Sequence, residues 1–229
     1  MNEETAPRGR FITLEGPEGS GKTTAARHLA SWLESRGVEA VLSREPGGTP
    51  VGDEIRHVLL HFQGVADDLD PRTDALLFAA QRAQHVARLI RPALERGSWV
   101  VSARYADSSL AYQGAGYGID PDEMRWLQRF ATDGLVPDLT ILLDVPVEVG
   151  LNRKRHGEWN RFEDTEAVTF FDTVRSAYLQ LAAEEPGRFT VIDGSGSVQD
   201  VDVAIQAVVE ERFLAGRDGI LAPPAERLS

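Results

Sequence analysis

The sequence of 229 residues contains no cysteine, and this absence excludes disulfide bonds and metal sites built from thiolates. It also lacks any run of apolar residues long enough to span a bilayer, so we expect no membrane partner. The opening residues, MNEETAPRGR, lack the basic segment and apolar stretch that mark a signal peptide. We therefore expect a soluble, cytoplasmic protein.

Basic residues are the second shortage. Lysine and arginine total 24 against 36 aspartates and glutamates, which gives a formal net charge of −12. A surface with this excess of negative charge does not favour binding to a nucleic-acid backbone, so we expect no nucleic-acid polymer as a partner. A local basic pocket can still bind a small anion such as a nucleotide.

Five short apolar segments are predicted to form buried strands. They are FITLE at residues 11–15, VEAVLS at 38–43, WVVS at 99–102, LTILLD at 139–144 and FTVID at 189–193. Strands that alternate with helices indicate an α/β fold with one parallel sheet, covered by helices on both faces. The length fits a single domain, and no repeat or linker interrupts the pattern. We assign this domain to residues 1–229, with a frayed tail at about 218–229.

Helix signals occupy the segments between these strands. One helix is predicted from Lys22 to Arg36, with Gly37 as its stop. Asp70-Pro71 and Asp120-Pro121 each combine an N-cap with a proline suited to the first helical position. The other expectations are a kink or end at Pro92, a helix at about 165–184 and a helix at about 198–213.

The segment GPEGSGKT at residues 16–23 matches the pattern G-x-x-x-x-G-K-[ST] in full, after a predicted strand and at the start of a predicted helix. Such a loop curls backbone N–H groups around an anion, and the helix N-terminus adds partial positive charge. Lys22 can reach the outer phosphates of a nucleoside triphosphate, and the Thr23 hydroxyl can bind Mg²⁺. The motif fits ATPases, GTPases and kinases alike. The predicted nucleotide-binding residues are Gly16, Pro17, Glu18, Gly19, Ser20, Gly21, Lys22, Thr23 and Thr24.

Two further stretches have polar residues in positions suited to a site. In REPGGT, the Pro46-Gly47-Gly48 turn follows a strand end, where ligands of open α/β sheets bind. In LLFAAQRAQH, Phe78 and Arg82 lie four residues apart and share one helix face, so they could sandwich a flat base. Without further context, a core phenylalanine beside a surface arginine is the better interpretation of this pair.

Four stretches together resemble the thymidylate kinases, which phosphorylate dTMP with ATP in dTTP synthesis. The resemblance extends from residue 11 to about residue 213. It implies the P-loop nucleoside monophosphate kinase fold, ATP and Mg²⁺ as cofactors, dTMP as the small-molecule substrate, and a homodimer. The stretches are REPGGT at residues 44–49, LLFAAQRAQH at 76–85, RYADSSLAYQGAG at 104–116 and PDLTILLDVPVEVGLNR at 137–153.

The resemblance also implies roles for single residues in dTMP binding. The loop of Arg44 and Pro46 packs around the dTMP phosphate, and Arg56 is a second phosphate ligand. Phe78 stacks on thymine, while Arg82 donates a hydrogen bond to a thymine carbonyl. The remaining implied contacts are Ser109 and Gln113 with the base edge, Tyr112 with the sugar 2′ position, and Glu15 with the sugar 3′ hydroxyl and the metal-bound waters.

A basic side chain must reach the transferring phosphoryl group in this family, and Pro17, Glu18, Gly19 and Ser20 supply none. The segment LNRKRHGEWNRFE at residues 151–163 instead holds four basic residues. It resembles the bacterial arrangement in which a lid, at about 153–163, carries the catalytic arginines. The resemblance implies that Arg153 stacks on adenine and that Arg155 and Arg161 clamp the phosphates. The implied catalytic residues are Lys22, Arg104, Arg155 and Arg161.

Thymidylate kinases usually have Asp-Arg-Tyr or Asp-Arg-His where this sequence has Ala103-Arg104-Tyr105. Arg104 is implied to bridge the donor and acceptor phosphates. Without the neighbouring carboxylate, we expect intact folding and dTMP binding but weakened turnover, unless Glu15 or Asp107 partly substitutes.

Two alternatives stay open. The chain could be a nucleotide-binding protein that has lost efficient catalysis, or a kinase for another monophosphate such as dUMP or dGMP. The histidines form no metal-ligand pattern, and we assign them no role. They are His28, His57, His61, His85 and His156.

Overall fold

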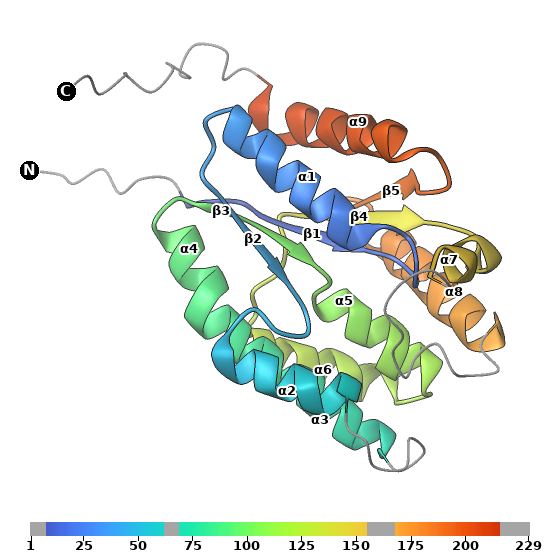
Figure 1. The fold of residues 1–229 in the computed structure, drawn as a ribbon. Coiled ribbons are helices and arrows are strands. Elements are labelled where there is room, and N and C mark those ends of the chain that lie inside the picture. Colours follow the sequence, from blue (N-terminus) through green and yellow to red (C-terminus); the bar gives the residue numbers. More distant parts are fainter. Residues whose placement is uncertain (1–7, 62–68, 155–167, 216–229) are drawn as a thin grey trace, which may run out of the picture.

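The computed structural model describes residues 8–61, 69–154 and 168–215. Five parallel strands form one sheet in the order β2-β3-β1-β4-β5 (Figure 1). This confirms the predicted parallel α/β fold. The second strand begins two residues later than predicted, and the third includes Ala103. The strands are β1 (Phe11–Glu15), β2 (Ala40–Arg44), β3 (Trp99–Ala103), β4 (Leu139–Asp144) and β5 (Phe189–Asp193).

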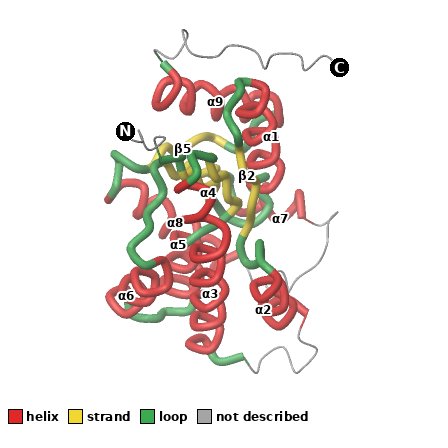
Figure 2. Tube along the Cα trace, turned by 90° about the vertical axis from the view of Figure 1, so that its left-hand side faces the viewer, coloured by secondary structure: helices red, strands yellow, loops and turns green. Residues whose placement is uncertain are grey.

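Helices cover both faces of this sheet, as Figures 1 and 2 show. One face carries α1 (Lys22–Ser35) and α9 (Val198–Val209), which continues into the π-helical turn η5 (Glu210–Leu214). The other face carries the remaining large helices. These are α2 (Pro50–His61), α3 (Pro71–His85), α6 (Pro121–Thr132) and α8 (Val168–Glu184), with the short segments η2 (Val86–Ile90), α4 (Arg91–Glu95), α5 (Ala106–Ser109), η3 (Leu110–Gly116) and α7 (Val147–Lys154).

The core follows from the alternation of side chains along each strand. In β1, Ile12 and Leu14 pack on the α1 side against Leu29. Phe11 points the other way and meets Tyr105 edge-on, with ring centroids 4.8 Å apart. Because both faces are covered, all five residues of β1 are buried, including the polar Thr13 and Glu15.

The predicted helix starts are confirmed by their caps. The Asp70 carboxylate accepts from the N–H of Arg72 at 2.8 Å, and Asp120 accepts from the N–H of Asp122 at 2.9 Å. Pro92, however, does not end its helical run. The π turn η2 widens the helix just before this proline, which has no N–H to donate, and the chain continues as α4. No helix among the described residues is long and apolar enough to cross a bilayer.

Candidate active site

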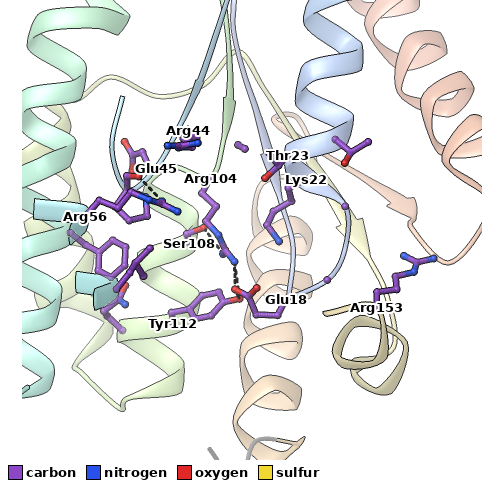
Figure 3. A pocket seen from close by; sticks show the side chains of 18 of the residues that line it. Glu18, Lys22, Thr23, Arg44, Glu45, Arg56, Arg104, Ser108, Tyr112 and Arg153 are labelled. Carbon is purple, nitrogen blue, oxygen red and sulfur yellow. Dashed lines mark hydrogen bonds and ion pairs between the residues drawn. The ribbon is translucent and has the colours of Figure 1, made fainter. Parts of the chain in front are cut away.

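A cavity of about 650 Å³ lies at the carboxyl ends of β1, β2 and β3 (Figure 3). Ligands of open α/β sheets bind at such an edge, because the loops that follow the strands converge there. Each of these three strands leads directly into a segment that resembles a nucleotide kinase site. The predicted site residues that line the cavity are Glu18, Gly19, Gly21, Lys22, Thr23, Thr24, Arg44, Pro46, Arg56, Phe78, Arg104, Tyr112, Gln113 and Arg153.

The phosphate-binding loop (residues 16–23) joins β1 to α1, as the sequence predicts. Gly21 has φ +88°, a left-handed conformation that favours glycine. Gly19 packs so closely on the backbone of Gly150 that a β-carbon would lie 1.9 Å from the Gly150 carbonyl oxygen. The Lys22 ammonium group donates to the carbonyls of Gly16 and Pro17 at 2.9 and 2.7 Å. The loop thus curls around the position where the lysine charge is held.

Arg104 extends into the middle of the cavity, where its guanidinium meets the Glu18 carboxylate (Figure 3). Its backbone has φ +71°, and its N–H donates to the Leu14 carbonyl at 2.9 Å. The guanidinium lies 4.9 Å from the centre of the Tyr112 ring. Burial favours the neutral form, but Tyr112 and Glu18 outweigh that effect and hold the pKa of Arg104 well above its usual range. The cavity therefore has a permanent positive charge at its centre.

Two carboxylates predicted in the nucleotide site occupy different environments. Glu18 lines the cavity and accepts a hydrogen bond from the Tyr112 hydroxyl at 3.2 Å. Glu15 is fully buried below it and accepts from the Tyr105 N–H at 2.7 Å and the Ser108 hydroxyl at 2.6 Å. Burial, with repulsion from Asp107, raises the pKa of Glu15 to about 7. Glu18, which the sequence placed among the ATP contacts, is the carboxylate beside Tyr112.

The hypothesis that Asp107 substitutes for the missing carboxylate at Ala103 is wrong. Asp107 is 3% exposed, and both of its oxygens accept from the Arg188 guanidinium, at 2.7 and 2.9 Å. It does not line the cavity, whereas Ala103 does. Glu15 does not line the cavity either, and it is already held by three donors.

The acceptor side of the cavity is formed by the loop after β2 and by the helices below the sheet. Arg56 reaches back from α2 and donates to the Pro46 carbonyl at 2.9 Å. Phe78 from α3 lines the cavity beside Gln113, whose amide donates to Asp74 at 2.9 Å. Aromatic and amide groups therefore face the same space as Arg44, which is the combination that a phosphorylated base needs.

Arg82 and Ser109 lie behind this wall, and neither lines the cavity. Arg82 is fully buried and contacts Glu45 at 2.7 Å, the Ser109 hydroxyl at 3.0 Å, the Tyr105 carbonyl at 3.0 Å and the amide oxygen of Gln128. These contacts connect α3 with α5, α6 and the loop after β2. Direct contact of Arg82 and Ser109 with a base stays a prediction.

Some cavity residues were not predicted from the sequence. These residues are Leu60, His61 and Ser108, whereas Glu45, which follows Arg44 in the REPGGT segment identified from the sequence, also lines the cavity. The position of Ser108 after strand β3 was a signal for that residue, but nothing in the sequence pattern distinguished Leu60 and His61. Among the other predicted residues, Gly16, Pro17 and Ser20 belong to the loop without lining the cavity.

Arg153, near the end of α7, is the last residue along the described chain that lines the cavity. Its guanidinium donates to the carbonyls of Gly194 and Ser195, at 2.8 and 3.0 Å. In Figure 3 it lies on the far side of the phosphate-binding loop from Arg44. Arg155 and Arg161 lie outside the described residues.

The residues that could hold Mg²⁺ are few. Thr23 lines the cavity beside Lys22. No group of three or more histidine, aspartate or glutamate side chains in the described ranges could hold a metal ion. Mg²⁺ bound to a nucleotide commonly uses one or two protein ligands together with phosphate oxygens and water. A single hydroxyl ligand such as that of Thr23 therefore fits a metal ion that is bound mainly by the nucleotide phosphates.

The comparisons with known proteins agree with this geometry. A family model described as Thymidylate kinase matches residues 14–205. A thymidylate kinase of Bifidobacterium longum (strain DJO10A) is 50% identical over 204 residues, which cover 89% of this chain and 98% of that protein. One from Chromohalobacter salexigens is 48% identical over 207 residues, 90% of this chain and 97% of that protein. The crystal structure of thymidylate kinase from Ehrlichia chaffeensis matches with a TM-score of 0.71 at 33% identity, covering 89% of this chain and 99% of that one.

Proposed function

Because the chain belongs to the thymidylate kinase family, we propose that it transfers the terminal phosphoryl group of ATP to dTMP, giving ADP and dTDP. It is a phosphotransferase whose acceptor is itself a phosphate. The observation that supports this function best is the single cavity that joins Lys22 and Thr23 to Arg44, Phe78 and Arg104. One end binds triphosphate, the other fits a base and a monophosphate, and an arginine lies between them.

On the donor side, the phosphate-binding loop surrounds the ATP phosphates with N–H groups, and Lys22 exchanges its carbonyl contacts for phosphate oxygens. Thr23 would hold Mg²⁺ together with the nucleotide. Bound Mg²⁺ would supply positive charge that neutralises the negative charge on the group in transfer. Arg153 packs against adenine near residues 194–195, whose carbonyls it already contacts.

On the acceptor side, Phe78 stacks on thymine while Gln113 contacts the base edge. Arg44 and Arg56 bind the dTMP phosphate, and the Arg56 contact to Pro46 orients that side chain. Tyr112 packs against the deoxyribose. Glu18, instead of Glu15, contacts the sugar on this side, because only Glu18 lines the cavity.

Arg104 works between the two substrates. It releases Glu18 and binds oxygens of both the donor and the acceptor phosphates, and this neutralises their mutual repulsion. The acceptor is a phosphate monoester with a second pKa of about 6, so it is already largely ionised at neutral pH and needs no general base. Positioning and charge neutralisation are therefore the main sources of catalysis. Arg155 and Arg161, which lie outside the described residues, are the further arginines that we assign to binding the phosphates.

An ADP-release assay with ATP and a panel of monophosphates tests this function. We expect the highest kcat/KM for dTMP, with dUMP lower because it lacks the methyl group and dGMP lower because a purine is larger than thymine and presents a different edge to Gln113. No preference for dTMP would favour a kinase for another monophosphate. Calorimetric dTMP binding without turnover would indicate a nucleotide-binding protein. The cytoplasmic location stays a prediction.

We further propose that the enzyme is a homodimer that associates through α2, α3 and α6. These three helices lie side by side below the sheet (Figure 2). They expose Val51, Leu76, Trp126 and Phe130, and the last two are 65% and 73% exposed. The rings of Trp126 and Phe130 stack with centroids 5.7 Å apart. Large apolar side chains gathered on adjacent helices are typical of a surface that is covered by a partner.

Replacing Trp126 with aspartate should convert the dimer to a monomer, because a charge would be buried against an apolar surface. Sedimentation or light scattering after size exclusion measures the change. Val203 on α9 is equally exposed at 65% but lies on the opposite face, so Val203→Asp serves as the matched control. A monomeric wild type, or an unchanged mass for Trp126→Asp, would refute the proposed interface.

A further inference from the structure

We propose that His85, which does not line the cavity, is a positioning residue for the dTMP phosphate site, because it fixes the residues on either side of Arg44, namely Ser43 and Glu45. The inference rests on the proposed function in one respect: that Arg44 binds the acceptor phosphate. His85 lies at the end of α3, the helix that also carries Phe78. The contact therefore connects the part of the site that binds the base with the part that binds the phosphate.

Both ring nitrogens of His85 are engaged with residues that flank Arg44. Nδ1 lies 3.0 Å from a Glu45 carboxylate oxygen, and Nε2 lies 2.7 Å from the Ser43 hydroxyl. His85 is fully buried, Ser43 is 9% exposed and Glu45 is 3% exposed, whereas the intervening Arg44 is exposed; of these four residues, Arg44 and Glu45 line the cavity. Side chains alternate along a strand. Ser43 and Glu45 point inward and are both held by the His85 imidazole. Their fixed positions therefore determine the direction in which the Arg44 side chain points outward.

The hydrogen bonds have a single consistent direction for a neutral imidazole. A carboxylate only accepts, so Nδ1–H donates to Glu45, and the Ser43 hydroxyl donates to Nε2. Arg82 holds the other Glu45 oxygen at 2.7 Å. The hydrogen bonds run from Ser43 through His85 to Glu45, which is the same order of residue types as in a hydrolytic triad. The resemblance ends there. Neither Ser43 nor His85 lines the cavity, so the serine has no access to a substrate.

The loop beyond Glu45 also packs directly on His85. A β-carbon built on Gly48, which has φ +82°, would lie 2.8 Å from the Ser43 hydroxyl and 2.9 Å from His85 Nε2. The neighbouring Gly47 N–H donates to the Gln81 side chain at 3.1 Å. Gln81 and His85 lie four residues apart and so share one face of α3. This face fixes both the loop and the strand end that present Arg44.

The test compares how tightly the enzyme binds dTMP and thymidine, which lacks the phosphate. In His85→Phe, a ring of similar size makes neither hydrogen bond. We expect dTMP affinity to fall about 10-fold, the lower end of the range known for residues that orient the ligands of a metal ion, which act in a similar way. Thymidine affinity should change less than about 2-fold, because Phe78 is untouched. In turnover assays KM for dTMP should rise while KM for ATP stays constant.

Two further variants strengthen the test. His85→Asn retains an N–H near Nδ1 and should recover part of the dTMP affinity. If His85→Phe fails to fold, Ser43→Ala provides the test, because it removes one of the two hydrogen bonds. It should also lower the affinity for dTMP relative to the affinity for thymidine. His28→Phe is the matched control, since His28 is partly exposed and pairs with Asp202 between α1 and α9.

An unchanged ratio of the dTMP and thymidine dissociation constants overturns the inference, whether both ligands still bind or both weaken equally. Calorimetry measures this ratio without turnover. Absence of dTMP phosphorylation by the wild type would instead refute the proposed function, so the two failures are distinguishable.

Discussion

Replacing Arg104 with methionine is expected to lower kcat by about 10³-fold, the lower end of the range measured for arginines that stabilise phosphoryl transfer. The guanidinium pairs with the Glu18 carboxylate in the centre of the cavity, between the residues that bind the two substrates. Methionine retains much of the side-chain length but has no charge and no donor. Steady-state turnover with saturating ATP and dTMP measures the loss.

The conservative variant Arg104→Lys should be intermediate. Lysine restores the charge but not the planar set of donors that can bind two phosphate groups together. Arg36→Met is the matched control, because Arg36 pairs with Glu210 at the far end of α1 and does not line the cavity. We expect its kcat to stay within about 2-fold of the wild type. If Arg104→Met lowers kcat less than about 10-fold, Arg104 does not bridge the phosphates.

Replacing Ala103 with aspartate is expected to raise kcat by about 10-fold to 100-fold, the range by which residues around a metal site change affinity or activity. Ala103 lines the cavity together with Thr23 and Arg104. It ends β3, where its carbonyl accepts from the Glu45 N–H at 2.9 Å. A carboxylate there would lie in the cavity wall, where it could accept hydrogen bonds from waters bound to Mg²⁺.

The neutral variant Ala103→Asn separates charge from shape. It matches aspartate in size, so we expect it to leave kcat close to the wild-type value. The half-saturating Mg²⁺ concentration should fall in Ala103→Asp and stay constant in Ala103→Asn. Equal rates in the wild type and Ala103→Asp would contradict this account, since neither Glu15 nor Asp107 lines the cavity to supply the charge instead.

Much of the fold follows from local patterns in the sequence. The apolar runs predict the five strands, and Asp70 and Asp120 predict two helix starts that the structure confirms. The phosphate-binding loop is also local, because its glycines and the following helix are neighbours in sequence. Pro92 is the instructive exception. A proline inside a helical pattern is expected to disturb it, but the π turn before Pro92 accommodates the missing N–H.

The sequence by itself determined the strand and helix pattern, the nucleotide-binding motif and the identity of Arg104 and Ala103 at the end of β3. Only the tertiary structure decided which of Glu15 and Glu18 faces the cavity and which pairs hold the site together. Arg104 meets Glu18 across 86 positions of sequence, and His85 meets Glu45 across 40. Such pairs form because distant strands end at one edge of the sheet. Local periodicity carries no information about which side chains meet there.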